Sequence, residues 1–208
     1  MEEEKPEVSN METRIFEAAE ELFLNQGYAK TSTGQIAKLA GCNQALVHYY
    51  YRTKDNLFDL VFESKVRLVV NNILAVDSPE GNLDSKIAGM VGAHFDYLKQ
   101  NPKIIPFIFN ELSTNYERLQ SLITKLQQYP QSLLTHLKAD LKEGIEKGLV
   151  REISEIDLLL SIASLNVTPF LIMPFFQKAL NLSDKELDIA LEKRKAEIIE
   201  TILSRLRK

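Results

Sequence analysis

Apolar residues recur three and four positions apart along almost the whole chain, which is the period of an amphipathic helix. No stretch alternates apolar and polar residues as a strand does, and no internal repeat is found, so the pattern predicts an all-α protein. The first helix should begin near Asn10, because Ser9 and Glu12 have capping-box spacing, and end at Gly27. The face that it must bury carries Ile15, Ala18, Ala19, Leu22 and Phe23.

Two short helices separated by a tight turn are predicted between residues 31 and 54. Ser32 or Thr33 can cap the first helix, and Gln35 lies three positions beyond Ser32, as in a capping box. Gly41 permits a sharp reversal and Asn43 can cap the second helix. The first helix has a small apolar side made of Ile36, Ala37, Leu39 and Ala40. Two short helices joined by a short Gly-containing turn are the signature of a helix-turn-helix.

The second of these helices has two faces of different chemistry. Val47 and Tyr51 are four positions apart and should point inward. The opposite side carries amide, imidazole and phenol groups, which can reach base edges or phosphates in the major groove of DNA. Its residues are Gln44, Ala45, His48 and Tyr49.

The rest of the chain is also predicted to be helical. A long helix begins at Lys54, Pro130 should kink another long helix, and Gly148 should end it. Ser154 caps the next helix, and Ser183 opens the last one with a capping box. The predicted helices cover residues 54–73, 83–100, 116–147 and two stretches that start at 154 and 183, with a short apolar segment at 103–111 and a loop at 77–82.

Residues 158–177 contain no charged side chain over 20 positions, which is long enough to consider a membrane span of about 20 residues. Polar residues and two prolines dilute this stretch, and it lacks aromatic belts with flanking basic residues. A helix that is apolar all round is equally expected where the core covers one face and a partner subunit the other. We therefore expect no membrane span here.

Composition narrows the class of protein. A hydrophobic fraction of 45% and a charged fraction of 26% are typical of a folded soluble chain. The net charge of −4 means that any binding to nucleic acid must come from a local surface. The single cysteine, Cys42, excludes an internal disulfide framework and is interpreted as a small apolar residue, with a redox-sensing thiol as the alternative. Because no basic-then-apolar leader opens the chain, a cytoplasmic location is expected.

The helix-turn-helix region resembles the TetR family of bacterial transcriptional regulators (TetR/AcrR type). The resemblance implies that Thr33, Tyr49, Tyr50 and Lys54 contact phosphate, that Gln44, Ala45 and His48 face the bases, and that Asn43 lies on the same DNA-binding surface. His48 stands where the family usually has Tyr, Tyr50 where it usually has His, and Ala45 where Gly is common. The run that matches is Gly27-Tyr28, Thr31-Ser32-Thr33, Ile36-Ala37, Ala40-Gly41, His48-Tyr49-Tyr50-Tyr51, Lys54 and Leu57.

The resemblance also implies two domains. Residues 1–53 form the helix-turn-helix DNA-binding domain, of which 1–9 are expected to be a disordered tail, and residues 54–208 form a helical ligand-binding and dimerisation domain. The last two helices should pair two copies of the chain into a homodimer. The expected function is that of a repressor that binds a palindromic DNA operator as a dimer and is released by a small molecule.

A ligand pocket is implied by the family and agrees with the residues of the body. Glu111 and His94 are the strongest candidates, because a titratable group on an apolar stretch needs a partner. For any one of the aromatic and Met residues, a plain core role is the alternative. The candidate pocket residues are Met90, His94, Phe95, Tyr97, Phe107, Asn110, Glu111, Tyr116, Asn166, Phe170 and Met173.

Other functions remain as alternatives. A helical small-molecule-binding or interaction protein without sequence-specific DNA binding is the main one, given the acidic net charge. An enzyme is not expected, because no phosphate loop, no metal-spaced His/Cys cluster and no nucleophile with a base is seen. No cofactor or metal is expected either.

Overall fold

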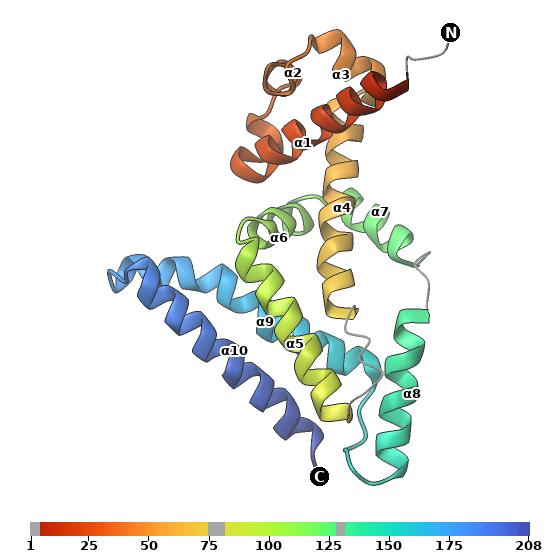
Figure 1. Ribbon diagram of the computed structural model, residues 1–208, viewed down its shortest axis with the longest axis vertical. Coiled ribbons are helices and arrows are strands. Elements are labelled where there is room, and N and C mark those ends of the chain that lie inside the picture. The colour runs from red at the N-terminus through yellow and green to blue at the C-terminus, as the bar shows by residue number, and fades with distance from the viewer. Residues whose placement is uncertain (1–4, 75–81, 128–131) are drawn as a thin grey trace. The chain divides into compact units, whose positions relative to one another are not determined.

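The computed structural model describes residues 5–74, 82–127 and 132–208 (Figure 1). Within these residues the chain forms ten helices and an isolated β-bridge between Val150 and Arg207. The prediction of an all-α protein is therefore confirmed. The predicted loop at 77–82 and the predicted kink at Pro130 fall mainly outside the described residues.

The helices belong to two compact units. The first unit comprises the chain up to Arg67 together with Phe107–Leu122, and the second comprises Leu68–Pro106 and Ile123–Lys208. The unit that contains the helix-turn-helix thus extends well beyond residue 53. Its helices are α1 (Lys5–Lys30), α2 (Thr33–Ala40), α3 (Gln44–Tyr51), most of α4 (Lys54–Leu74) and α6 (Ile104–Thr114), and the first part of α7 (Tyr116–Gln127).

Helix α1 starts earlier than predicted. It begins at Lys5, not near Asn10, so only residues 1–4 of the expected tail lie outside the described chain. Pro6 lies in the first turn, where its missing N–H costs no helical hydrogen bond, and this was the better start signal. The helix was predicted to end at Gly27; α1 instead continues to Lys30, with a kink at Gly27, whose φ of 78° is not helical.

The caps of the two short helices are confirmed. Ser32 Oγ accepts a hydrogen bond from the Gln35 backbone N–H, and the Ser32 backbone N–H donates one to the Gln35 side-chain oxygen. Gly41 adopts the left-handed conformation with φ 69°, and Asn43 Oδ1 accepts from the Leu46 N–H. Val47 and Tyr51 are buried, as predicted. The Tyr51 hydroxyl donates to the Glu12 carbonyl, which ties α3 to α1.

An aromatic cluster around Phe58 of α4 forms the centre of the first unit. Phe58 is fully buried, and its ring lies 4.9 Å from Phe23 and 5.1 Å from Tyr28 of α1, centroid to centroid. Phe107 of α6 lies 5.5 Å away on another side, and Phe62 stacks at 6.1 Å. Three helices therefore depend on one side chain of α4 for their shared core.

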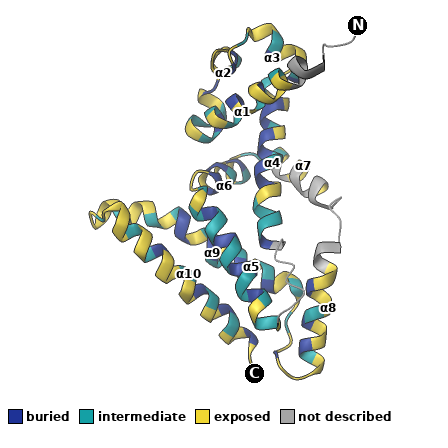
Figure 2. Ribbon diagram, viewed as in Figure 1, coloured by how far each residue is buried: buried dark blue, intermediate teal, exposed yellow. Residues whose placement is uncertain are grey.

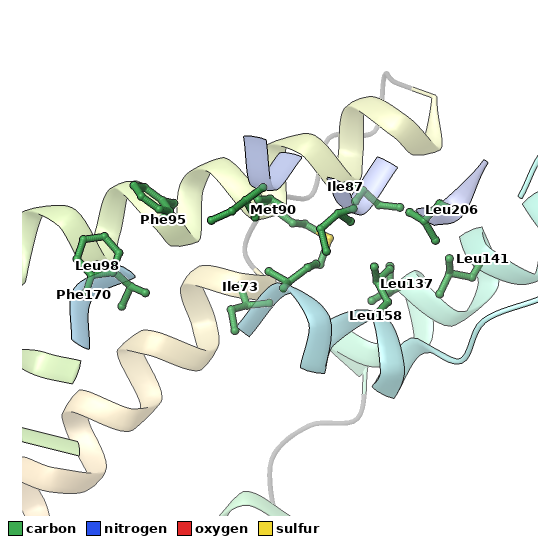
Figure 3. Close-up of a cluster of buried hydrophobic side chains, with 14 of the residues drawn as sticks. Ile73, Ile87, Met90, Phe95, Leu98, Leu137, Leu141, Leu158, Phe170 and Leu206 are labelled. Carbon is green, nitrogen blue, oxygen red and sulfur yellow. The ribbon is translucent and has the colours of Figure 1, made fainter. Parts of the chain in front are cut away.

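The second unit is a bundle of α5 (Leu83–Gln100), α8 (Ser132–Glu146), α9 (Glu155–Ala179) and α10 (Asp184–Leu206). Helices α5, α9 and α10 pack against one another, and α8 packs against α5 and α9. Their inward faces meet in one hydrophobic core (Figure 3). The long helix predicted at 116–147 is present as α7 and α8, and Gly148 closes α8 with φ 68°.

Helix α9 has both buried and exposed positions along its length (Figure 2), and large apolar residues occupy positions of both kinds. It is the one helix among the described residues that is long and apolar enough to cross a membrane by length and composition, although core helices of soluble proteins pass the same test. Leu158, Ile162 and Phe170 face the core of the unit. The exposed large apolar residues of α9 are Ile156, Leu160, Ile172, Phe175 and Phe176.

Replacing Phe58 by Ala should lower the free energy of unfolding by about 3–5 kcal/mol, because it leaves a cavity among four aromatic rings. The matched control is Phe109→Ala in the same unit, where the ring is 56% exposed and the cost should stay below about 1 kcal/mol. Urea denaturation of both variants measures the difference. Equal losses would show that Phe58 is not the centre of this core.

Candidate DNA-binding surface and effector site

The start of α2 and the start of α3 are joined by a side-chain hydrogen bond. Gln44 Nε2 donates to Thr33 Oγ1 over 2.6 Å. The two helix N-termini carry partial positive charge and free N–H groups, which favours phosphate binding nearby. Thr33 is half-buried and Gln44 is exposed, so a phosphate and a base can be met from one edge of the helix-turn-helix.

The outer face of α3 presents the predicted DNA-contacting groups to solvent. Ala45 and His48 are exposed with Gln44, and Asn43 is exposed at the helix start while its side chain caps α3. Tyr49 is 65% exposed, and its ring packs edge-on against Tyr50, which is half-buried. The arrangement brings all of these residues onto one small helix, as predicted, although contact with DNA stays a prediction.

The hydrogen bond of His48 determines its tautomer. Its Nδ1 lies 3.0 Å from the Arg52 carbonyl oxygen, which can only accept, so Nδ1 carries the proton. In the neutral ring Nε2 is then an acceptor that points away from this bond. An exposed acceptor on a recognition helix fits the amino group of adenine or cytosine in the major groove.

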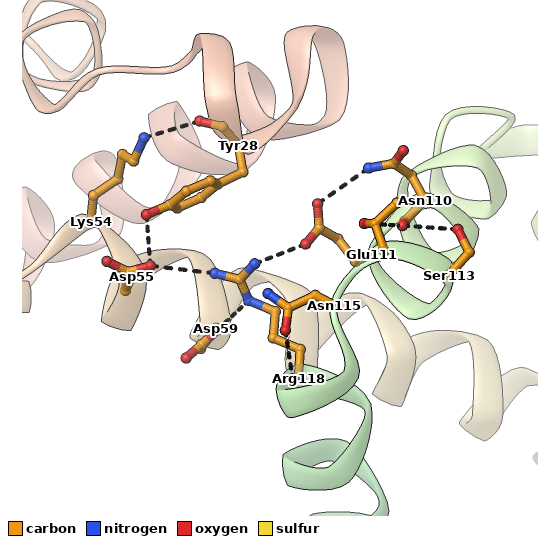
Figure 4. Close-up of polar contacts among 10 residues, drawn as sticks. Tyr28, Lys54, Asp55, Asp59, Asn110, Glu111, Ser113, Asn115 and Arg118 are labelled. Atoms are coloured by element: carbon orange, nitrogen blue, oxygen red, sulfur yellow. Dashed lines mark hydrogen bonds and ion pairs between the residues drawn. The ribbon is translucent and has the colours of Figure 1, made fainter.

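Lys54 is engaged within the first unit. Its ammonium group donates to the carbonyls of Tyr28 and Thr31 at 3.1 and 3.0 Å and lies 3.8 Å from the centre of the Tyr28 ring. It thereby holds the end of α1 to the start of α4 (Figure 4). The predicted phosphate contact stays a prediction, and the structure adds a positioning role for the same side chain.

Three basic residues near α3 were not among the residues that the family motif indicated. Residues 30–54 contain four basic residues and neither Asp nor Glu, so this stretch has a formal charge of +4 in a chain of net −4. Lys30, Lys38 and Arg52 are exposed and Lys54 is half-buried. Counting charge over this segment alone would have found the local surface that DNA binding requires.

An ion-pair cluster joins α6 and α7 to α4 within the first unit (Figure 4). Arg118 donates from Nη1 to Glu111 at 2.8 Å and from Nε to Asp59 at 2.8 Å, and Nη2 lies 3.5 Å from Asp55. The Tyr28 hydroxyl donates to Asp55 over 2.6 Å, and this bond raises the pKa of Tyr28. The cluster therefore connects α6 and α7 to α4, the helix that follows the helix-turn-helix.

Glu111 is thus paired with a side chain of the protein. It is 7% exposed, as the sequence suggested, but its carboxylate is held by Arg118 and by the amide of Asn110 at 3.4 Å. A cationic ligand is not needed to explain this buried charge. The physical reason for predicting that Glu111 faces an effector, its need for a partner, is therefore removed.

The predicted pocket residues do not converge within one compact unit. Phe107, Asn110, Glu111 and Tyr116 belong to the first unit, and Tyr116 is 72% exposed. The expectation of one common body is wrong, because the chain passes from the second unit into the first within α6. The remaining candidates share the second unit, where Tyr97 and Met173 are half-buried and the others are buried: Met90, His94, Phe95, Asn166 and Phe170.

His94 of α5 and Asn166 of α9 are brought together in the core of the second unit. Both are fully buried, and Asn166 Nδ2 donates to the Val91 carbonyl at 2.9 Å and to His94 Nδ1 at 3.0 Å. Burial lowers the pKa of His94 to about 4, so the ring is neutral near pH 7. The pair is a polar point in an otherwise apolar interior.

The alternative of a redox-sensing thiol at Cys42 gains no support. Burial raises the pKa of the half-buried Cys42 thiol, which keeps it protonated and agrees with an apolar role. The described part of the chain holds no group of three or more His, Cys, Asp or Glu side chains placed to hold a metal ion.

The short helices α2 and α3, with the exposed outer face of α3, are those of a helix-turn-helix protein. Comparison with known proteins gives its family. Residues 15–61 match the family model for bacterial regulatory proteins of the tetR family. Residues 84–202 match the model for the tetracyclin repressor-like C-terminal domain. The chain belongs to the TetR family, and it is a helix-turn-helix transcriptional regulator.

Individual relatives agree with this assignment. YvkB of Bacillus subtilis, an uncharacterized HTH-type transcriptional regulator, is 26% identical over 183 residues, which are 86% of this chain and 88% of YvkB. The fatty acid metabolism regulator protein of the same organism is 24% identical over 139 residues, 67% of this chain and 70% of that one. The crystal structure of a TetR-family transcriptional regulator from Haemophilus influenzae superposes with a TM-score of 0.64 at 16% identity, covering 98% of this chain and all of that one.

The neutral state of His94 predicts a pH dependence of stability. The pKa of His94 is about 4 in the folded protein and 6.5 in its unperturbed form, so between these values the unfolded chain binds the extra proton. The stabilising contribution is present above pH 6.5 and is lost as the pH falls towards 4. Its slope is at most about 1.4 kcal/mol per pH unit.

Urea denaturation between pH 4 and 7 measures this slope. His94→Gln should flatten the dependence, whereas His136→Gln should leave it unchanged, because His136 is exposed on α8. A wild-type slope retained by His94→Gln would contradict the assignment of the proton uptake to His94.

Proposed function

We propose that this protein is a ligand-responsive repressor that binds a palindromic DNA operator as a homodimer in the cytoplasm and is released by a small molecule. The observation that carries the proposal is the outer face of α3, which exposes Gln44, His48 and Tyr49 within a segment of charge +4. Groups that read bases and charges that attract phosphate occur together there. This combination supports DNA binding better than the alternative of a purely ligand-binding helical protein.

The homodimer is proposed to form through α9 and α10. Leu160, Phe175 and Leu180 are 62%, 68% and 63% exposed, and Ile189 of α10 is 47% exposed. Large apolar residues gathered on two adjacent helices mark a protein interface more often than a free surface. A twofold dimer would present two α3 helices to half-sites about 34–36 Å apart, or multiples of this, on a palindrome.

The effector is proposed to act through the ion-pair cluster of Arg118. A ligand bound in the second unit would shift α6, and α6 carries Glu111, the partner of Arg118. Arg118 also holds Asp59 of α4, the helix that begins directly after the recognition helix. Ligand and DNA would then oppose each other with a coupling free energy of about 1–3 kcal/mol, and each would weaken the other equally.

Purified protein bound to fragments of bacterial genomic DNA, followed by footprinting, tests the proposal as a whole. A palindromic protected site supports the dimeric repressor. Binding that shows no sequence preference would favour the alternative function.

Lys54→Ala should lower operator affinity by about 10-fold or more, since it removes a charged donor near the backbone of DNA. If Lys54 contacts phosphate, the slope of log affinity against log salt should also become smaller by about 0.9. Lys142→Ala is the matched control, because Lys142 is exposed on α8. Fluorescence anisotropy at several salt concentrations gives both quantities. Lost affinity with an unchanged slope would leave Lys54 only its contacts with Tyr28 and Thr31.

The double variant Leu160→Glu and Phe175→Glu should be a folded monomer at micromolar concentration, because it places charges on the proposed interface. Operator affinity should fall by on the order of 100-fold, since the two half-sites are no longer bound together. Leu149→Glu introduces the same charge at a residue that is 64% exposed and lies outside α9 and α10. Sedimentation measures the assembly. A dimeric double variant, or a monomeric wild type, would contradict the proposed interface.

A further inference from the structure

His94 and Asn166 each keep one polar atom without a hydrogen-bond partner. Nε2 of His94 and Oδ1 of Asn166 are buried and meet no partner within the described part of the chain. Buried polar groups in native proteins are nearly always paired, because an unpaired one loses its hydrogen bonds to water and gains none. Two such atoms on two side chains that touch each other call for a partner that the described part of the chain does not supply.

The chemistry of the two atoms follows from the bonds that the pair already makes. The Val91 carbonyl can only accept, so the Asn166 atom facing it is the amide nitrogen, and the free atom is the carbonyl oxygen Oδ1. The same nitrogen donates to His94 Nδ1, which must therefore be unprotonated. In the neutral ring the proton then lies on Nε2. The pair offers one donor, Nε2–H, and one acceptor, Oδ1.

The surroundings of the pair are apolar. His94 follows Val91 by one helical turn in α5, and Asn166 follows Ile162 by one turn in α9. Phe95 directly follows His94 in α5, and Phe170 lies one turn after Asn166 in α9; their ring centroids are 5.0 Å apart. These residues belong to the hydrophobic core of the unit (Figure 3). A molecule that reached the pair would therefore have a mainly apolar body.

We propose that His94 Nε2 and Asn166 Oδ1 form the polar recognition point of an effector site between α5 and α9, and that the effector is an uncharged, mainly apolar molecule carrying a hydroxyl or amide group. Such a group accepts from Nε2–H and donates to Oδ1, so it satisfies both atoms together. A carboxylate would be repelled by the partial negative charge of the Asn166 oxygen, and an ammonium would be repelled by the partial positive charge of the Nε2–H hydrogen. Either ion would also bring an unpaired charge into the core.

This inference deepens the proposed function, because the molecule is taken to be the effector of the regulator. Its binding to the second unit, however, requires no DNA. The experiment can therefore use the full-length protein alone, with small aromatic probes of similar size: benzyl alcohol, benzamide, toluene and benzoate.

Long-range proton–nitrogen NMR of the imidazole rings reads the site directly in unmodified protein. The chain has three histidines, and His48 and His136 are exposed, so they serve as internal controls. Benzyl alcohol and benzamide should shift the His94 Nε2 signal saturably and leave the other two unchanged. Their affinity should exceed that of toluene and of benzoate by about 10-fold, the effect of one well-made buried hydrogen bond.

Two variants test the assignment of the residues. His94→Phe and Asn166→Leu should each abolish the roughly 10-fold preference for the hydrogen-bonding probes. Thr168→Val, which removes an exposed hydroxyl two positions further along α9, should keep it. If a variant does not fold, the NMR measurement on the wild type still decides.

The possible outcomes separate the two proposals. No saturable shift of His94, equal binding of toluene, or tighter binding of benzoate would overturn the inference, as would a water molecule that stays on Nε2 when the probes are present. DNA binding by the same protein would then still support the proposed function. Selective probe binding by a protein that binds no operator would refute the repressor and retain the ligand site.

Discussion

The packing of Phe58 is the constraint on which the DNA-binding unit depends. This one ring of α4 is fully buried between Phe23 and Tyr28 of α1 and Phe107 of α6, with the Arg118 guanidinium 4.2 Å from its centre. Protein interiors are packed too densely for one such ring to move alone. The position of α4 therefore sets those of α1 and α6, and through Tyr51 and the Glu12 carbonyl it also sets that of α3.

The ion pairs around this core limit how its helices can pack. An apolar face can slide over another at little cost, but a buried ion pair tolerates few arrangements. Glu111 and Arg118 are 9% and 13% exposed in their side chains, and Arg118 reaches Asp59 of α4 in the same geometry. Further along α4, Lys65 is 8% exposed and lies 2.5 Å from Glu20 of α1. These pairs support the proposal that α4 carries the effect of a bound ligand to α3.

The second unit combines two faces of one helix in different roles. The inner side of α9 contributes Leu158, Ile162 and Phe170 to the core and places Asn166 beside His94. The outer side exposes large apolar residues that a lone chain leaves in water. A helix without charge over 20 residues can serve both the core and a proposed partner subunit. This explains why the same segment also has the length and composition of a membrane span.

Local sequence was sufficient for the helices, their caps and the helix-turn-helix, because these depend on hydrogen bonds and conformations within a few residues. Ser32, Gly41, Asn43 and Ser183 act as expected for that reason. Only tertiary structure decided the partners of the buried polar groups. That Glu111 pairs with Arg118, and that His94 meets Asn166 72 positions away, depends on how distant helices pack, which no local pattern records. The sequence identified both Glu111 and His94 as residues that need a partner. The fold gives Glu111 a partner within the chain, Arg118, and leaves Nε2 of His94 without one among the described residues.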